Sequence, residues 1–322
     1  MKARGLIALV IAGLAWTASA CGSGDGADTA KDIRLDYAYY NPLSLVIRDQ
    51  KLLENRGYNV TWVLSAGSNK ANEALRSDAL DLGSTAGAAA LVARANGTPI
   101  KVVDIYSRPE WAALVVAQDS PIATVAELRG KKVAVTKGTD PYYFLLQSLK
   151  AAGLSRGDVE IVNLQHADGK TALERGDVDA WSGLDPFIAQ TVQESGSRLL
   201  YRNPDFNSYG TLNAREDFIS GNPEAVQSVV DVYEEARAWA IAHPNELTEL
   251  LAREAKISPS VAGEVLQRTD LTVDPTPGQA QTEVLTIVAP IAVGDGDIKS
   301  GEAGQQALET LIEPKFAQQS AS

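Results

Sequence analysis

Four short polar loops contain the residue types that bind small anions in proteins. Each loop follows an expected strand and precedes an expected helix, and the loops span residues 39–42, 65–68, 84–87 and 137–141. Small side chains let a ligand approach the backbone, hydroxyl groups donate hydrogen bonds, and the free N–H groups of a helix start attract negative charge. A single loop of this kind is commonly only a helix cap. Four at equivalent places predict an anion-binding cleft, and the candidate contacts are Tyr39, Tyr40, Asn41, Gly67, Ser68, Ser84, Thr85, Lys137, Gly138 and Thr139.

Aromatic and acidic side chains near these loops have two interpretations each. Tyr142, Tyr209 and Trp111 could cover an organic ligand or pack in the core. Asp185 directly precedes a proline, which is typical of a helix N-cap, and it could instead pair with a ligand amine or hydroxyl. Lys137 either attracts anions or is a solvated charge. Tyr142, Asp185 and Tyr209 complete the set of candidate ligand contacts.

The elements that must position these residues alternate between strand and helix. Short β-rich runs and helical runs follow one another from Asp32 to about Tyr201, which predicts an α/β fold with parallel sheets flanked by helices. After about Asn222 the pattern is almost wholly helical, with prolines near the expected helix starts. The expected strands are Ile33–Tyr37, Tyr58–Leu64, Leu80–Gly83, Lys101–Tyr106, Trp111–Ala117, Lys132–Val135, Val159–Leu164, Asp179–Trp181 and Leu199–Tyr201.

Two segments of the chain are similar to each other. Residues 74–84 read ALRSDALDLGS, and residues 172–182, which begin 98 positions later, read ALERGDVDAWS. Each reads as the end of a helix, a polar turn and a short apolar strand. Such a repeat predicts one duplicated supersecondary unit in each half of the fold.

Composition argues against several functions. The histidines are His166 and His243, and Cys21 is the only cysteine, so no Cys/His cluster has metal-ligand spacing. Neither a Gly-x-Ser-x-Gly nucleophile motif nor a phosphate-binding Gly-x-x-x-x-Gly-Lys-Ser/Thr loop is present. A formal net charge of −12 disfavours nucleic acid as a partner. We therefore expect no catalysis, no metal, no cofactor and no nucleic acid. His166 follows the expected strand Val159–Leu164, so it either faces the cleft or is a polar loop residue, and we expect the latter.

The first residues predict export. Two basic residues precede an apolar stretch at residues 6–16, and small residues then lead to Cys21, as in a bacterial lipobox. Residues 1–20 are expected to be a signal peptide, Cys21 a lipidated N-terminus, and residues 21–31 a flexible tether. The alternative is an ordinary secretory signal that leaves a free thiol.

Three longer segments resemble a known family. They are ALRSDALDLGSTAG at 74–87, DSPIATVAELRGKKVAVTKGT at 119–139 and ALERGDVDAWSGLDPF at 172–187. Together they resemble the aliphatic sulfonate, taurine and nitrate binding proteins of ABC importers, which are themselves similar to thiamine-precursor binding proteins. The middle segment is the most specific, because it combines a turn, a short helix, a strand and a helix start in a fixed order.

The resemblance implies a fold and a function. The fold would be the two-lobed periplasmic-binding-protein type II fold, with residues 32–115 and 212–322 in lobe 1, including the helical C-terminal tail, and residues 116–211 in lobe 2. The protein would be a monomeric lipoprotein, held by its lipid anchor on the extracytoplasmic face of the cell membrane. It would capture a small organic anion such as an alkanesulfonate between the lobes and deliver it to ABC permease and ATPase subunits. Nitrate or bicarbonate, a thiamine-precursor-like pyrimidine, and a ligand-sensing role without transport remain alternatives.

One departure from the family pattern bears on the ligand. Relatives often carry a tryptophan immediately before the Asp-Pro pair, where this chain has Leu184. If Leu184 lines the pocket, the pocket is roomier and apolar at this point, which favours an organic anion with an alkyl tail over nitrate or bicarbonate. The alternative is that Leu184 faces the core.

Overall fold

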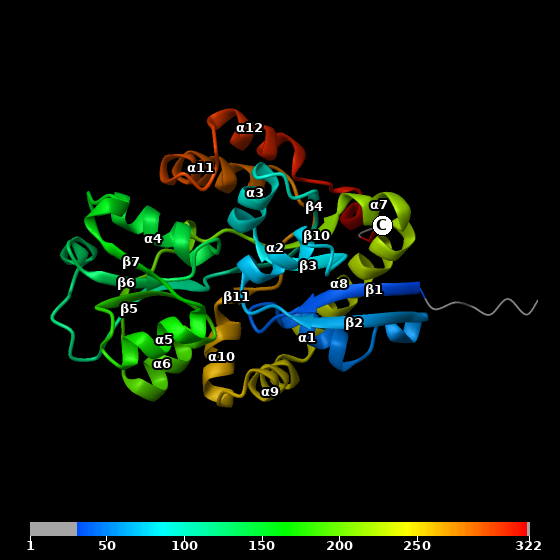
Figure 1. Cartoon of the computed structure of the whole chain (residues 1–322). Coiled ribbons are helices and arrows are strands. Elements are labelled where there is room, and N and C mark those ends of the chain that lie inside the picture. The colour runs from blue at the N-terminus through cyan, green and yellow to red at the C-terminus, as the bar shows by residue number, and fades with distance from the viewer. Residues whose placement is uncertain (1–30, 321–322) are drawn as a thin grey trace, which may run out of the picture. The chain divides into compact units, whose positions relative to one another are not determined.

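Two β-sheets form the framework of the protein (Figure 1). The structure is a computed structural model that describes residues 31–320. The larger sheet has the strand order β11-β4-β10-β3-β1-β2, and the smaller one has the order β7-β6-β8-β5-β9. β1 pairs in parallel with β2 and β3, and β6 pairs in parallel with β7 and β8, whereas β10 and β5 run antiparallel to their neighbours. The strands are β1 (Lys31–Tyr37), β2 (Tyr58–Leu64), β3 (Leu82–Ala86), β4 (Ile100–Pro109), β5 (Ala112–Val116), β6 (Lys132–Val135), β7 (Glu160–Asn163), β8 (Ala180–Leu184), β9 (Arg198–Tyr201), β10 (Gly210–Arg215) and β11 (Thr269–Asp270).

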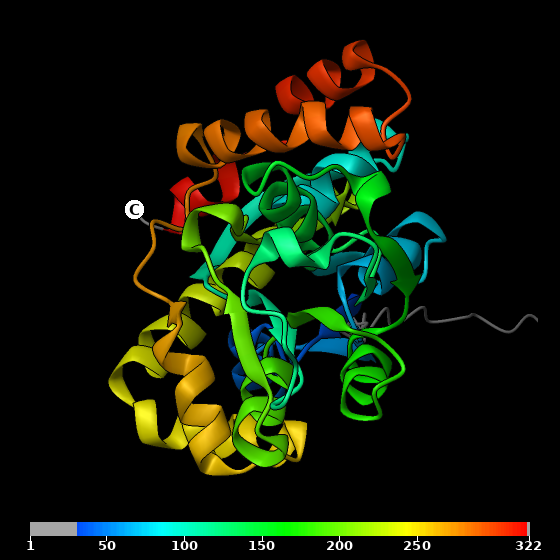
Figure 2. The ribbon, with the colours of Figure 1, turned by 90° about the vertical axis from the view of Figure 1, so that its left-hand side faces the viewer.

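Helices cover the sheets, and the chain after residue 222 is almost wholly helical, as its sequence predicts. In Figures 1 and 2, α11 and α12 lie on one side of the sheets, and α9 and α10 lie on the opposite side. Among residues 31–320, no helix is both long enough and apolar enough to cross a membrane. The helices are α1 (Pro42–Asp49), α2 (Ser68–Arg76), α3 (Gly87–Ala95), α4 (Asp140–Ala151), α5 (His166–Glu174), α6 (Phe187–Ser195), α7 (Glu216–Gly221), α8 (Pro223–Ala242), α9 (Pro244–Ala255), α10 (Pro259–Gln267), α11 (Gln279–Asp295), α12 (Gly301–Thr310) and α13 (Lys315–Ser320), and short 3₁₀ turns span Glu54–Arg56, Val125–Leu128, Arg156–Asp158 and Pro204–Phe206.

The structure confirms the duplicated unit. α2 and β3 have counterparts in α5 and β8, whose bounds lie 98 positions later in every case. The turns before the two strands also match: Asp81 Oδ2 accepts from the backbone N–H of Arg34 at 2.7 Å, and Asp179 Oδ2 accepts from that of Lys132 at 2.8 Å. The first helices follow the same offset, because α1 begins at Pro42 and α4 at Asp140. The two sheets are therefore built on the same βαβ plan.

Two strands extend further than their sequence suggests. β3 includes Ser84 and Thr85, which pair with Leu212 and Thr211 of β10. The prediction of a loop at residues 84–87 was therefore wrong. Their hydroxyls find partners inside the sheet, since Ser84 Oγ donates to Asp36 Oδ1 at 2.8 Å and Thr85 Oγ1 donates to the carbonyl of Ala86 at 3.0 Å. Buried hydroxyls that are bonded in this way are stable in a strand. β8 likewise continues to Leu184 rather than ending at residue 181.

Candidate functional site

A pocket lies where strand ends and helix starts of the two sheets meet. The residues after β1, at the end of β2, at the start of α5 and around the start of α6 line it. This is the expected place for a ligand, because ligands of open α/β sheets bind beyond the carboxyl ends of the strands. Its lining residues are Tyr39, Tyr40, Leu64, Ser65, Ala66, Gln165, His166, Ala167, Leu184, Asp185, Pro186 and Phe187.

Two helices present their N-termini at this pocket without a side-chain cap. α2 begins after Gly67 and α5 begins after Gln165, and neither of these N-cap residues bonds to the helix through its side chain. The first N–H groups of such helices have no intrahelical partner, and the helix dipole adds partial positive charge. An anion is the natural ligand for a site of this kind.

His166, the first residue of α5, lines the pocket and has a ring nitrogen that is unpaired among residues 31–320. It is 1% exposed, and its Nδ1 lies 3.1 Å from Thr136 Oγ1. Its Nε2 has no hydrogen-bond partner in the described part of the chain and lies 3.0 Å from the position that a Cβ on Gly67 would occupy. Burial lowers the pKa of His166 to about 3, so the imidazole is neutral. His166 is not the polar loop residue that its sequence context suggested. The repeat was the signal, because His166 is the counterpart of Ser68 at the start of α2.

Asp185 serves as a cap and as an ion-pair partner at the same time. Its Oδ1 accepts from the backbone N–H of Ala189 at 3.0 Å, and its Oδ2 accepts from Arg268 Nη2 at 2.7 Å. Burial raises the pKa of Asp185, and the neighbouring Arg268 opposes that increase. The carboxylate therefore holds the start of α6 next to the end of α10, and Arg268 is a charged group near the pocket that the sequence did not indicate.

Tyr40 forms part of the pocket wall in front of a buried carboxyl group. Its hydroxyl donates to the carbonyl of Ser84 at 3.0 Å, and the backbone N–H of Ser84 donates to Asp36 Oδ1 at 2.8 Å. Asp36 is fully buried, and burial raises its pKa to about 6. Asp36 is thus a polar group behind the wall rather than in it.

Several predicted contacts lie away from this pocket. Asn41 caps α1, where its Oδ1 accepts from the N–H of Ser44 at 3.3 Å, and its Nδ2 donates to Tyr233 Oη at 3.0 Å. Ser84 and Thr85 are inside β3 and fully buried. Tyr209 lines a smaller pocket with Gly87, Leu285 and neighbours from α11.

None of the residues in the expected loop at 137–141 lines the pocket. Thr139 Oγ1 donates to the carbonyl of Thr136 at 2.7 Å, and Lys137 Nζ lies 5.0 Å from the centre of the Tyr142 ring. Tyr142 points away, and its hydroxyl donates to Asp295 of α11. Gly138 has a φ of +74° and would place a Cβ 3.6 Å from Asn69 Cβ, so it lies beside α2.

Of the predicted contacts, Tyr39, Tyr40 and Asp185 line the pocket, Gly67 lies against His166, and Ser68 begins α2, where its Oγ accepts from the backbone N–H of Ala86 at 2.9 Å. Leu184 lines the pocket as well, and it is 5% exposed. Trp111 does not line it, because its Nε1 donates to Asp140 Oδ2 at 2.7 Å and its ring meets Tyr40 edge-on at 5.9 Å.

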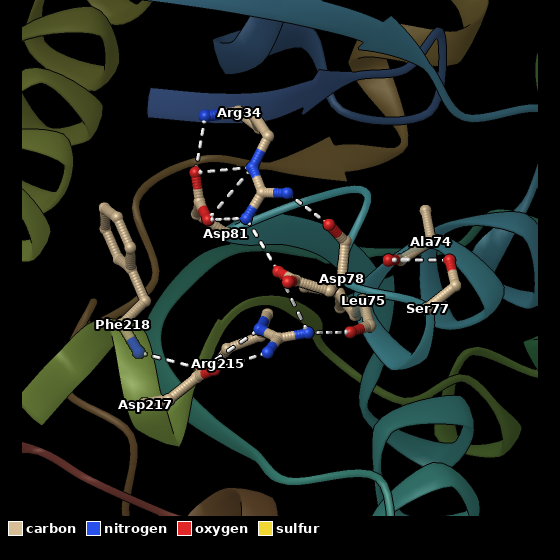
Figure 3. A network of polar contacts seen from close by, with 9 residues as sticks. All are labelled: Arg34, Ala74, Leu75, Ser77, Asp78, Asp81, Arg215, Asp217 and Phe218. Atoms are coloured by element: carbon tan, nitrogen blue, oxygen red, sulfur yellow. Dashed lines mark hydrogen bonds and ion pairs between the residues drawn. The ribbon is translucent and has the colours of Figure 1, made fainter. Parts of the chain in front are cut away.

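A second group of charges lies at the opposite end of β3 (Figure 3). Arg34 pairs with Asp81 and Asp78, with the Asp78 contact at 2.7 Å, and Arg215 pairs with Asp78 at 3.3 Å and also with Asp217. Each arginine therefore has carboxylate partners, and the network joins β1, the turn before β3 and the end of β10. Because both arginines are paired within the network, we assign it to the stability of the sheet.

Comparison with known proteins is consistent with this geometry. Residues 49–247 match the family model described as NMT1/THI5 like. A curated relative, the putative aliphatic sulfonates-binding protein of Escherichia coli, is 30% identical over 84% of this chain and 86% of its own length. The solved structure of the aliphatic sulphonate binding protein SsuA from Escherichia coli is 26% identical, has a TM-score of 0.74, and matches over 89% of this chain and 93% of its own.

Two further structures share the fold. The alkanesulfonate-binding protein SsuA from Xanthomonas axonopodis, bound to MOPS, has a TM-score of 0.78 at 23% identity, over 88% of this chain and 98% of its own. The desulfurization enzyme DSZB has a TM-score of 0.66 at 17% identity, over 90% of this chain and 99% of its own. The fold itself is therefore found in both binding proteins and an enzyme. Because the family model spans more than half of the chain and the curated relative is 30% identical over most of both sequences, this chain belongs to the NMT1/THI5-like family, together with aliphatic sulfonate-binding proteins.

Proposed function

We propose that this protein is the extracytoplasmic substrate-binding component of an ABC importer and that it captures an alkanesulfonate in the pocket between the two sheets. The observation that carries the proposal is a mainly apolar pocket that borders two uncapped helix starts. Leu64, Leu184 and Phe187 contribute to its apolar wall, and His166 at the start of α5 lines it. The uncapped start of α2 lies next to His166, beside Gly67. A sulfonate with an alkyl tail fits this arrangement, with its head group at the helix starts and its tail on the apolar wall.

Binding without chemical conversion fits the groups that line the pocket. His166 is the histidine in the lining, and the hydroxyl next to it, on Thr136, donates to the carbonyl of Leu164 at 2.7 Å. Because that hydrogen is engaged elsewhere, the imidazole does not activate Thr136 as a nucleophile. The only cysteine, Cys21, precedes the described residues. These features support a binding protein rather than an enzyme of the same fold.

A calorimetric titration with sulfonates of increasing chain length tests the proposal. Each additional methylene on the apolar wall contributes about 0.8 kcal/mol, so butanesulfonate should bind about 15-fold more tightly than ethanesulfonate. Nitrate has no tail to cover the wall and should bind more weakly than either. The buffer must not itself be a sulfonate. Tighter binding of nitrate than of butanesulfonate would refute the proposed substrate class.

The matched variant for this titration is Leu184→Trp. An indole at residue 184 would occupy the space that the alkyl tail needs, so the gain per methylene should shrink while the affinity for ethanesulfonate changes less. An unchanged chain-length dependence would place the tail elsewhere.

We also propose that Cys21 carries a lipid anchor on the extracytoplasmic face of the cell membrane. The proposal rests on the lipobox-like sequence, since Cys21 lies outside the described residues. Wild-type protein should fractionate with membranes and Cys21→Ser should be soluble. Equal solubility of the two proteins would contradict the anchor. A monomer held in this way would deliver its ligand to ABC permease and ATPase subunits.

The division into lobes is part of the same proposal. Residues 32–115 with 212–322 would form one lobe, and residues 116–211 the other, with closure around the ligand. Support comes from the two separate sheets and from the two chain passages between them, before β5 and before β10. Small-angle scattering should show a smaller radius of gyration with butanesulfonate, and an unchanged radius at saturation would contradict closure.

A further inference from the structure

The hydrogen bonds around His166 determine which of its nitrogens carries the hydrogen. Thr136 Oγ1 has one hydrogen, and that hydrogen is donated to the carbonyl of Leu164 at 2.7 Å. The contact of 3.1 Å between Thr136 Oγ1 and His166 Nδ1 is then a hydrogen bond only if Nδ1 is the donor. A neutral His166 therefore has its hydrogen on Nδ1 and a lone pair on Nε2.

This lone pair faces the place where an anion would be held. His166 Nε2 is buried, lacks a partner among residues 31–320, and lies beside Gly67 at the start of α2. The N-termini of α2 and α5 favour negative charge there. A lone pair repels an anionic oxygen. The helix N-termini would therefore attract an anion at this place, whereas the neutral imidazole would repel it. Addition of a proton to Nε2 removes the conflict, because both ring nitrogens are then donors.

We propose that His166 takes up one proton when the anionic ligand binds, so that Nε2–H donates to a ligand oxygen while Nδ1–H continues to donate to Thr136. The inference rests on the proposed function, since it requires an anion in this pocket. The proton comes from solvent or buffer acid and adds to the lone pair of Nε2, and no bond of the ligand is broken. His166 is thus a ligand-contacting residue whose charge appears only in the complex.

The surroundings leave the imidazole neutral before the ligand arrives. Burial lowers the pKa of His166 to about 3, and no charged neighbour supplies a compensating attraction. A sulfonate within hydrogen-bond distance would stabilise the imidazolium and raise that pKa. The titratable or charged groups on the surrounding elements are Tyr39, Tyr40 and Asp185 in the pocket wall, Arg268 paired with Asp185, Asp36 behind the wall, Lys70, Glu73 and Arg76 on α2, Lys132 on β6, Lys137 after it, Asp168, Lys170 and Glu174 on α5, and Glu194 on α6.

Proton uptake has a direct calorimetric signature. Titration of the full-length protein with butanesulfonate at a pH of about 5, above the free pKa of about 3, in acetate, piperazine and histidine buffers, should give binding enthalpies that change with the ionisation enthalpy of the buffer. The slope should be positive and should reach one proton taken up per ligand where the pH lies well below the bound pKa. By linkage, the association constant should fall as the pH rises through the interval between the free and bound pKa values, by up to about tenfold per pH unit.

Three variants identify the group that takes up the proton. His166→Gln retains an amide donor near the position of Nε2 but cannot titrate, so it should bind butanesulfonate with no proton uptake and no pH dependence of affinity. His243→Gln changes the other histidine, which stacks on Trp239 at 5.0 Å outside the pocket, and should keep the uptake. Asp36→Asn removes a buried carboxyl group behind the pocket wall, whose pKa is raised to about 6, and should also keep the uptake.

The outcomes separate the inference from the proposed function. If wild-type protein binds no sulfonate in any buffer, the proposed function is wrong. If it binds butanesulfonate with enthalpies that are independent of the buffer, the function stands and the inference is overturned. Uptake that survives in His166→Gln, or that disappears in Asp36→Asn alone, would also overturn it.

Discussion

Replacing Gly67 by valine is expected to weaken butanesulfonate binding by about 100-fold while the protein stays folded. A Cβ on Gly67 would lie 2.8 Å from Asn69 Oδ1 and 3.0 Å from His166 Nε2, where the head group of the ligand is expected. The backbone of Gly67 has a φ of 164°, an extended conformation that valine adopts without strain. Added methyl groups would therefore displace these side chains and the ligand rather than unfold α2. A 100-fold loss corresponds to about 2.7 kcal/mol, within the range for overpacked sites.

Titration calorimetry measures this loss, and a thermal unfolding midpoint close to that of wild type shows that the fold is retained. The control is Gly301→Val, because a Cβ at this helix start would meet no described atom within 4 Å. That variant should bind like wild type. Wild-type affinity in Gly67→Val would move the head group away from α2.

Replacing Asp140 by alanine is expected to lower the free energy of unfolding by about 3–5 kcal/mol, because each buried donor left unpaired costs about 1–3 kcal/mol. Asp140 is the first residue of α4 and is 2% exposed. It accepts from Trp111 Nε1 at 2.7 Å, from the Ser208 backbone N–H at 2.8 Å and from Ser208 Oγ at 2.6 Å. Trp111 and Ser208 lie on the two chain passages between the sheets. The substitution therefore leaves three buried donors unpaired where the two sheets are held together.

Chemical denaturation measures this change in the free energy of unfolding. The control is Asp119→Ala, which replaces an exposed acidic residue in a loop and should stay within about 0.5 kcal/mol of wild type.

The Asp140→Ala substitution should also change how the free energy of unfolding depends on pH. Burial raises the pKa of Asp140 to about 6, whereas an unfolded aspartate titrates near pH 3.9. The folded state therefore binds more protons between these values, and this group's contribution to stability falls as the pH rises from 4 to 6. An identical stability and pH profile in wild type and Asp140→Ala would contradict the role of Asp140.

The alternation of strands and helices was predictable because burial on both faces gives strands such as Lys132–Val135 a short apolar run. The repeat was predictable for a related reason. Each of the two matching turns has an aspartate at the same position, Asp81 or Asp179. Its carboxylate accepts a hydrogen bond from a backbone N–H of the neighbouring strand. The ends of β3 and β8 were less predictable, because small polar residues such as Ser84 read as a loop unless their partners in another strand are known.

The site itself was only partly predictable from sequence. Tyr39 and Tyr40 could be placed because they closely follow a strand end, and Asp185 could be placed because it precedes a proline at an expected helix start. Tyr142 could not, since its hydroxyl is claimed by Asp295, which is distant in sequence. His166 was underestimated because a lone histidine after a strand is usually a surface residue. Its role depends on its burial and on the hydrogen bond that the Thr136 hydroxyl donates to the carbonyl of Leu164. Neither can be predicted from the local sequence.

The most direct test of the central claim is a crystal structure of the protein with 2-bromoethanesulfonate, in which anomalous scattering from bromine marks the tail of the ligand. The account predicts a sulfonate at the starts of α2 and α5, with an oxygen within hydrogen-bond distance of His166 Nε2. Bromine should lie against Leu184 or Phe187. A sulfonate bound elsewhere, or one whose bromine points to His166 and whose oxygens meet Leu184, would contradict it.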